Sequence, residues 1–113
     1  MTSEQQRIAI AKACGWRRIH GAEIYEWSWM DKNDNGTNEL PDYLNDLNAM
    51  HEAEKKLPEE RHPKWIRYLV QICTQTAAER RDKLVAPPAY YTATATAAQR
   101  AEAFLRTLNL WKA

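Results

Sequence analysis

The sequence is poor in the residues that carry covalent catalysis and in those that cradle phosphate groups. It contains three glycines and two cysteines, and serine stands only at positions 3 and 28. No Gly-x-Gly or Walker pattern is present, which excludes the glycine-rich phosphate loops. Neither serine lies in a nucleophile elbow. These absences argue against an enzyme, and we expect a non-enzymatic protein that needs no cofactor.

Long apolar runs are missing as well. No stretch approaches the roughly 18 residues that a membrane helix needs, so we expect no membrane partner. The first residues lack the basic start and the apolar core of a signal peptide. Cys14 and Cys73 are too few for a disulfide framework and are typical of a reducing compartment. We therefore expect a cytoplasmic protein.

The chain also lacks a surplus of one charge. Its 113 residues include 16 Lys and Arg against 15 Asp and Glu, which gives a formal net charge of +1. Sequence-independent binding of long nucleic acid depends on a surplus of cations, so we expect no such partner. The length matches one domain, which we place over residues 1–113.

Capping and periodicity predict a first helix close to the N-terminus. Ser3 and Gln6 match a capping box, in which the hydroxyl and the amide satisfy backbone N–H groups of the first turn. The helix is expected to continue to about Ala13. It should stop at Gly15, because glycine tolerates the left-handed conformation that ends many helices.

Two more helices are predicted further along the chain. One begins near residues 45–46 and ends at Pro58, with apolar side chains spaced three to four residues apart. The other begins at Thr96, which forms a second capping-box pattern with Gln99, and ends with Asn109 as a C-terminal cap.

Alternating apolar and polar residues predict strands over residues 23–30, 65–74 and 89–94. All three stretches are rich in the β-branched and aromatic residues that suit a pleated, half-buried surface. The order of elements predicts an α+β fold. In it, an antiparallel sheet is packed by about three helices in an α-β-α sandwich-like arrangement.

An acidic segment after the first predicted strand matches the spacing of a calcium loop. The matching residues stand at loop positions 1, 3, 5, 6 and 12: Asp31, Asn33, Asn35, Gly36 and Asp42. The twelfth position is Asp rather than a bidentate Glu, and Asn-Gly after a strand is a common tight-turn signal. We favour a turn over an ion site.

Other candidates for catalysis or metal binding are sparse. The histidines do not converge in sequence, and no Cys-x-x-Cys pair is present. Cys14 and Cys73 are interpreted as small core residues. Glu52 and Glu54 are two residues apart on a predicted helix, so their carboxylates should point to different faces.

Arginines lie close to aromatic residues in the second half of the chain, where Trp65 stands between two of them. Guanidinium groups bind phosphates in a bidentate manner, and aromatic faces stack on bases. This pattern favours a nucleotide pocket, although charged runs are often solvated faces and aromatic stripes often core. The candidate ligand-binding residues are Arg61, Arg67, Tyr90, Tyr91, Arg100 and Arg106.

Three segments together resemble the phage ABA-sandwich domain family. Residues 8–16 are similar to its opening helix and Gly-Trp pair. Residues 41–57 resemble its Pro-x-Tyr segment, short cap and amphipathic helix, and residues 96–105 resemble its Ala-rich last helix. The segments span most of the chain, but each is short and degenerate, so their order and spacing carry the resemblance.

The resemblance extends to the phage anti-Thoeris proteins, and it implies a function. Such proteins are sponges that bind cyclic ADP-ribose isomers, and in some cases cyclic oligonucleotides of the CBASS system, and so inhibit host defence. They catalyse nothing and assemble as homo-oligomers. The resemblance thus implies a cyclic nucleotide ligand, a homo-oligomer and a location in the cytoplasm of an infected bacterial cell.

The resemblance also suggests roles for four of the candidate residues. An arginine on the last helix, Arg100 or Arg106, would hold the pyrophosphate, and an upstream aromatic, Tyr90 or Tyr91, would stack on adenine. A rival hypothesis is a structural or protein-interaction phage module that docks through the face of Tyr25, Trp27 and Trp29. A weaker one is a metal-dependent hydrolase or nuclease that uses the acidic loop.

Overall fold

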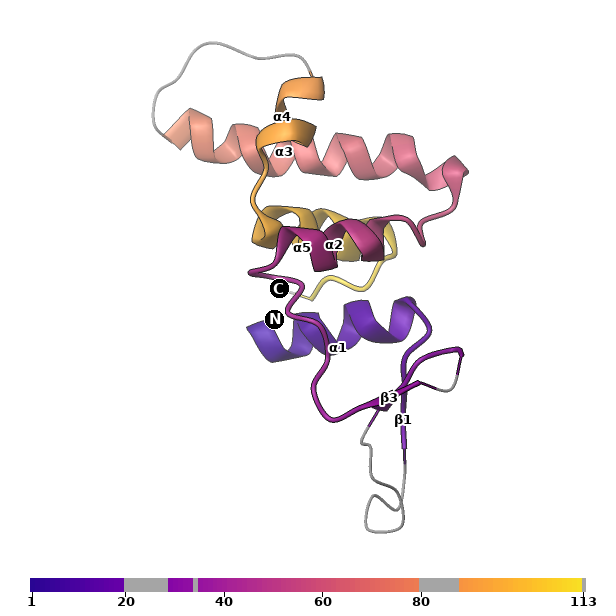
Figure 1. Cartoon of the computed structure of the whole chain (residues 1–113). Coiled ribbons are helices and arrows are strands. Elements are labelled where there is room, and N and C mark those ends of the chain that lie inside the picture. The colour runs from indigo at the N-terminus through magenta and orange to yellow at the C-terminus, as the bar shows by residue number, and fades with distance from the viewer. Residues whose placement is uncertain (20–28, 34, 80–87, 113) are drawn as a thin grey trace.

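The computed structural model describes residues 1–19, 29–33, 35–79 and 88–112 (Figure 1). Its elements in chain order are α1 (Ser3–Ala13), β1 (Arg17–Arg18), β2 (Trp29–Met30), β3 (Gly36–Thr37), α2 (Leu47–Glu54), the 3₁₀ helix η1 (Glu59–Arg61), α3 (His62–Glu79), α4 (Pro88–Thr94) and α5 (Ala97–Thr107). An antiparallel sheet accompanied by helices confirms the predicted α+β class. Among the helices described, none is long and apolar enough to cross a membrane.

The described strands form one small antiparallel sheet with β2 in the centre. Trp29 of β2 lies opposite Arg18 on one side and Thr37 on the other. β2 is the end of the strand that we predicted from position 23, and residues 23–28 lie outside the described part. Because β2 and β3 are antiparallel neighbours, the chain reverses direction between them, which confirms the predicted turn.

Helix α1 begins one residue earlier than predicted. The Oγ1 of Thr2 accepts a hydrogen bond from the backbone N–H of Gln5 at 3.1 Å, and the Thr2 N–H donates to Gln5 Oε1 at 2.9 Å. This capping box replaces the predicted box of Ser3 and Gln6, because the preceding hydroxyl caps equally well and adds one residue to the helix. Gly15 ends the segment with φ +100°, as predicted.

The other two predicted helices are confirmed, although α2 ends at Glu54, before the predicted end at Pro58. Asp46 accepts hydrogen bonds from two backbone N–H groups of the first turn of α2. Thr96 and Gln99 form the capping box of α5, at 3.1 Å and 2.9 Å. Asn109 adopts φ 59° just after α5, the left-handed conformation expected of its C-terminal cap.

The predicted strand over residues 65–74 is wrong, because this segment belongs to helix α3. Its side chains fit both a period of two and a period of 3.6, and the helical period matches the core. Leu69 is fully buried, and the residues packed around it lie three or four positions away along one helix face. These residues are Trp65, Ile72 and Cys73; Tyr68, next to Leu69 in sequence, also packs against the cluster.

The predicted strand over residues 89–94 is also wrong, because it forms helix α4. Tyr91 and Ala95 are both buried, at the four-residue spacing of a helical face. The hydroxyl of Thr94 donates to the carbonyl oxygen four residues earlier at 2.8 Å, which gives this β-branched residue a partner inside a helix. Packing against α3 therefore overrides the strand propensity of tyrosine and threonine.

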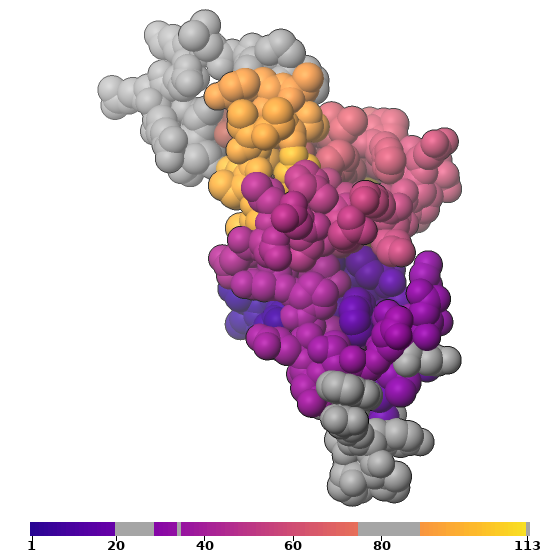
Figure 2. Space-filling model, in the orientation of Figure 1, coloured from indigo at the N-terminus to yellow at the C-terminus, as the bar shows by residue number. Residues whose placement is uncertain are grey.

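Helix α5 is central, because it packs against α1, α2 and α3. Figure 1 shows α3, the pair of α2 and α5, and α1 stacked in succession, with the sheet beyond α1. Phe104 and Leu105 of α5 are almost fully buried in one core cluster with Ile10 of α1 and Met50 of α2. In the space-filling view, the magenta segment that contains α2 occupies the middle of the face toward the viewer (Figure 2).

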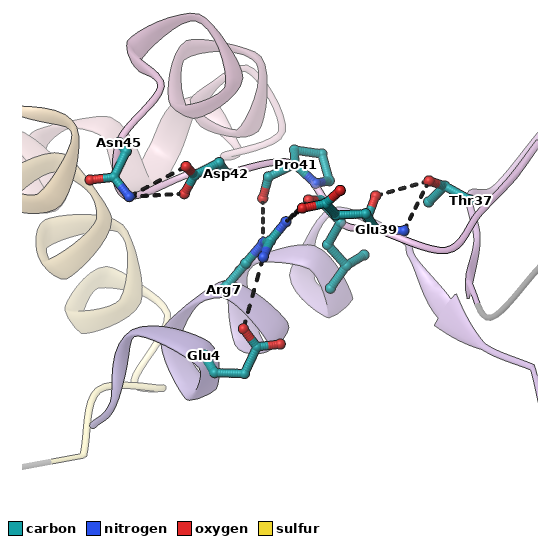
Figure 3. Close-up of polar contacts among 8 residues, drawn as sticks. Glu4, Arg7, Thr37, Glu39, Pro41, Asp42 and Asn45 are labelled. Carbon is teal, nitrogen blue, oxygen red and sulfur yellow. Dashed lines mark hydrogen bonds and ion pairs between the residues drawn. The ribbon is translucent and has the colours of Figure 1, made fainter.

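Arg7 fastens the loop before α2 to helix α1 (Figure 3). Its Nε donates to the carbonyl oxygen of Pro41 at 2.9 Å, and its Nη2 donates to that of Leu40. The guanidinium also lies 3.9 Å from a carboxylate oxygen of Glu4 and 3.7 Å from one of Glu39. Backbone acceptors on the loop therefore set where the chain enters α2.

We expect the cap of α5 to contribute to global stability, because α5 contacts three other helices. Thr96→Ala should lower the free energy of unfolding by about 1 kcal/mol, the usual contribution of an N-cap hydroxyl. Urea denaturation would measure the loss. Thr96 is exposed, so the change removes little packing. Thr96→Ser keeps the hydroxyl and is the matched control; equal losses in both variants would contradict the prediction.

Candidate functional site

Arg100, the first candidate from the sequence, points into the protein rather than toward solvent. It is only 4% exposed. Its Nη1 donates to Oε2 of Glu54 at 3.0 Å and lies 3.3 Å from Oε1. Its guanidinium carbon lies 5.9 Å from the ring centroid of Trp65. Arg100 therefore links α5 to α2 and α3.

Two more of the candidate arginines interact with the protein itself. The Nε of Arg106 lies 2.9 Å from a carboxylate oxygen of Glu102, and its guanidinium stands over the ring of Trp111 at 5.2 Å. The Nη1 of Arg61 donates to the carbonyl oxygen of Thr107 at 3.2 Å. A ligand phosphate would have to compete with these contacts.

The remaining candidates lie on α3 and α4. Arg67 is exposed on α3. Tyr90 is 56% exposed whereas Tyr91 is buried, and their rings meet edge to face with centroids 5.5 Å apart. In the four cavities that we describe within the described part of the chain, none of the six candidates contributes to the lining.

The predicted docking face is described in part. Trp29 is 7% exposed and belongs to the main core cluster, where the guanidinium of Arg18 lies 5.7 Å from its ring centroid. It is therefore a core residue. Tyr25 and Trp27 lie outside the described residues.

A cavity next to Arg100 brings an aromatic ring and basic side chains together. Its volume is about 400 Å³, within the range of small-molecule sites. The lining residues come from the end of α2, the turn after it and the start of α3: His51, Glu54, Lys55, Leu57, His62 and Trp65. We call this space the Trp65 cavity.

Two buried hydrogen-bond donors belong to Trp65, which lines the cavity, and to Arg100, which contacts the lining residues Glu54 and Trp65. The Nε1 of Trp65 and the Nε of Arg100 are both buried, and neither has a hydrogen-bond partner in the described structure. A buried donor without an acceptor costs about 1–3 kcal/mol. Most buried donors in native folds have a partner, so these two stand out.

Basic side chains surround the outer part of the cavity. The Nδ1 of His51 lies 3.9 Å from Oε2 of Glu54. The Nε2 of His62 lies 3.2 Å from the carbonyl oxygen of Leu57, which fixes the ring beside the cavity. Lys55 is 68% exposed and pairs with a surface carboxylate at 2.8 Å. A surface ion pair contributes at most about 1 kcal/mol, so the ammonium group is available to an anion.

Glu54 neutralises the charge of Arg100 at a cost in desolvation. Burial raises the pKa of the Glu54 carboxyl, and the nearby Arg100 and His51 side chains oppose this shift without cancelling it. Its neighbour Glu52 is exposed and turned to a different face, as predicted. The inner wall of the cavity is therefore close to neutral, and any net positive charge comes from Lys55 and the histidines.

The acidic loop forms a turn in this structure. Oδ1 of Asp31 accepts hydrogen bonds from the backbone N–H groups of Asn33 and Asn35, each at 2.9 Å. The bond from Asn35 is the main cause that lowers the pKa of Asp31. No group of three or more His, Cys, Asp or Glu side chains that could hold a metal occurs among the described residues.

Both cysteines pack against the core clusters, as predicted. Burial raises the pKa of the Cys14 thiol to about 11. Burial also raises the pKa of Cys73. Both thiols are therefore protonated at neutral pH and are poor nucleophiles.

Sequence reasoning missed most of the cavity. The histidines had no sequence motif to join them, and Glu54 was considered only as a possible acid or base. One available signal was the spacing of His51, Glu54 and Lys55 at three and four residues, which places them on one side of a helix. The partner of Glu54 on α5 is 46 residues away and leaves no local pattern.

Comparisons with protein-family models, with curated proteins and with solved structures find no match for this chain.

We expect the contact between Arg100 and Glu54 to be essential to the helix junction. Glu54→Ala should lower the free energy of unfolding by about 3–5 kcal/mol, because it leaves a buried cation without a partner. Glu54→Gln keeps an acceptor for Nη1 and should cost less. Urea denaturation at neutral pH would compare the variants.

The double variant Glu54→Leu/Arg100→Met tests whether the loss of stability comes from the unpaired charge or from lost side-chain volume. It replaces both charges with apolar groups and should recover most of the stability. A double variant as unstable as Glu54→Ala would contradict the prediction, because packing alone would then explain the loss.

Proposed function

We propose that this chain is a non-enzymatic binding protein that captures a small cyclic nucleotide in the Trp65 cavity. The ligand class is that of cyclic nucleotide immune signals, namely cyclic ADP-ribose isomers or cyclic oligonucleotides. Such a protein acts as a phage-encoded sponge in the cytoplasm of an infected bacterium and inhibits host defence. The observation that carries the proposal is the buried, unpartnered indole N–H of Trp65, a residue that lines a cavity together with Lys55 and two histidines.

The unpartnered donors favour a ligand rich in acceptors. Phosphate and carbonyl oxygens accept hydrogen bonds from N–H groups without bringing donors of their own. An oxygen that reached Nε1 of Trp65 would remove the cost of one unsatisfied buried group. This gain exists only in the complex, so it adds directly to affinity.

The walls of the cavity favour an anion with a flat ring system. The indole of Trp65 provides an aromatic surface for a base, and stacking on such a surface contributes about 1–3 kcal/mol per base. Lys55, His51 and His62 provide cationic or hydrogen-bonding groups for a phosphate. In this proposal Arg100 supports the wall, whereas the sequence predicted that it would hold the pyrophosphate.

Capture without turnover is consistent with the chemistry of the site. The two cysteine thiols are protonated, and Glu54 is engaged with Arg100. The site thus presents binding groups and no activated nucleophile among its described residues. We also propose that the chain assembles as a homo-oligomer, so that neighbouring protomers can enclose a ligand.

A thermal-shift panel tests the proposed function. The probes are cyclic dinucleotides, cyclic trinucleotides and cyclic ADP-ribose isomers. At least one should raise the melting temperature, because a ligand at 100 times its Kd stabilises the native state by about 2.7 kcal/mol. Heat-denatured complex should then release the same nucleotide intact, as measured by mass spectrometry. A degraded product would favour an enzyme, and no shift across the panel would favour a structural or protein-interaction module.

A charge-matched pair of variants tests the location. Lys55→Gln should weaken nucleotide binding several-fold, because it removes an ammonium group from the cavity. Lys56→Gln makes the same change one position later, on a residue that lines another cavity, and should leave affinity unchanged. Both lysines are exposed, so folding is preserved. Isothermal titration would measure Kd. Equal changes of Kd in the two variants would contradict the assignment of the ligand to the Trp65 cavity.

A further inference from the structure

The largest of the described cavities lies on the other side of the molecule, along helix α1. It is a groove of about 560 Å³ between α1 and the segment that follows α5. The nitrogen of Met1 donates to the carbonyl oxygen of Lys112 at 2.9 Å, so this segment lies against the start of the helix. We call it the α1 groove, and it shares no lining residue with the Trp65 cavity.

The surface of the α1 groove is mainly apolar. Ile8, Ala9 and Ala13 supply one side from α1, and Leu110 supplies the other. Leu110 is 37% exposed, which is unusual for a large apolar side chain among the described residues. Burial of apolar surface in such a groove contributes about 0.8 kcal/mol for each methylene group of a bound chain.

The charged side chains that line the groove are both lysines. Lys12 stands in the last turn of α1, and Lys112 lies near the first turn. Within the described part of the chain neither forms an ion pair, whereas Arg7, Lys55 and Arg106 each contact a carboxylate. No acidic residue lines the groove. Its charge is therefore complementary to an anion.

We propose that the α1 groove binds an aliphatic carboxylate, with its acyl chain along α1 and its head group beside a lysine. Eleven residues of α1 span about 16 Å at 1.5 Å per residue, a trough suited to a medium-length chain. The two lysines stand toward opposite ends of this trough, so a carboxylate finds a cation in either orientation. This site is separate from the Trp65 cavity and does not depend on the proposed function.

Titration calorimetry with laurate, kept below its micelle concentration, tests the proposal on the full chain. Laurate should bind with one-to-one stoichiometry, and dodecyltrimethylammonium, which has the same chain and the opposite charge, should bind at least about fivefold more weakly. Equal affinity for the two probes would overturn the charge argument. Absence of laurate binding would overturn the proposal outright.

Substitutions locate the site. The double variant Lys12→Gln/Lys112→Gln should raise the Kd for laurate by up to about fivefold, since it removes both lysine ammonium groups at exposed positions. Ala13→Trp, also at an exposed position, should block the groove by volume. Lys56→Gln is the control and should bind laurate like the parent chain. An unchanged Kd in both groove variants would overturn the assignment.

Two further experiments distinguish this proposal from binding to a membrane surface and from a single site shared with the nucleotide. In sedimentation with anionic phospholipid vesicles, saturation with laurate should abolish any binding of the protein to the vesicles. Binding to vesicles without binding to laurate would assign the groove to a membrane surface instead. The groove variants should keep any nucleotide-induced thermal shift, and Lys55→Gln should keep laurate binding. A nucleotide shift lost in the groove variants would mean that the two sites are not separate.

Discussion

The buried contact between Arg100 and Glu54 is the constraint around which the helices are arranged. It joins the central helix α5 to the end of α2, and the guanidinium also faces the ring of Trp65 on α3. Removal of two charges from water is expensive, and the raised pKa of Glu54 reflects that cost. The pair is therefore better understood as a device that specifies one arrangement of three helices than as a source of net stability. Any arrangement that separated the partners would leave a buried charge unpaired.

Trp65 shows why we place the proposed ligand at this junction. Its ring packs against both core clusters and at the same time lines the cavity. An aromatic wall that is held by the core loses little conformational freedom when a ligand arrives, so more of the contact energy is available for affinity. At this position the indole N–H has no hydrogen-bond partner, which costs free energy. An acceptor on the proposed ligand would remove that cost.

Helix ends could be predicted from the sequence, but long-range partners could not. Thr96 and Asn109 act where their own chemistry predicts, because a cap satisfies backbone groups within a few residues. The segment of residues 65–74 fits two periods, and only its packing against α5 decides between them. The prediction of the site residues was limited for the same reason. Arg100 was recognised as important, yet its acidic partner lies 46 residues away, so its burial and neutral surroundings were invisible in the sequence.

The net charge of +1 conceals an uneven distribution of basic groups. Among the described side chains, Arg100 is buried against Glu54 and Arg106 pairs with Glu102. Arg7 donates to two backbone carbonyl oxygens of the loop before α2. Lys12 and Lys112 carry their charge beside an open apolar surface. An ion-paired arginine positions the fold, whereas a lysine without an acidic neighbour keeps its charge for a ligand. Arg100 and Arg106, which first suggested a binding site, are therefore engaged within the fold, whereas both proposed anion sites include lysines.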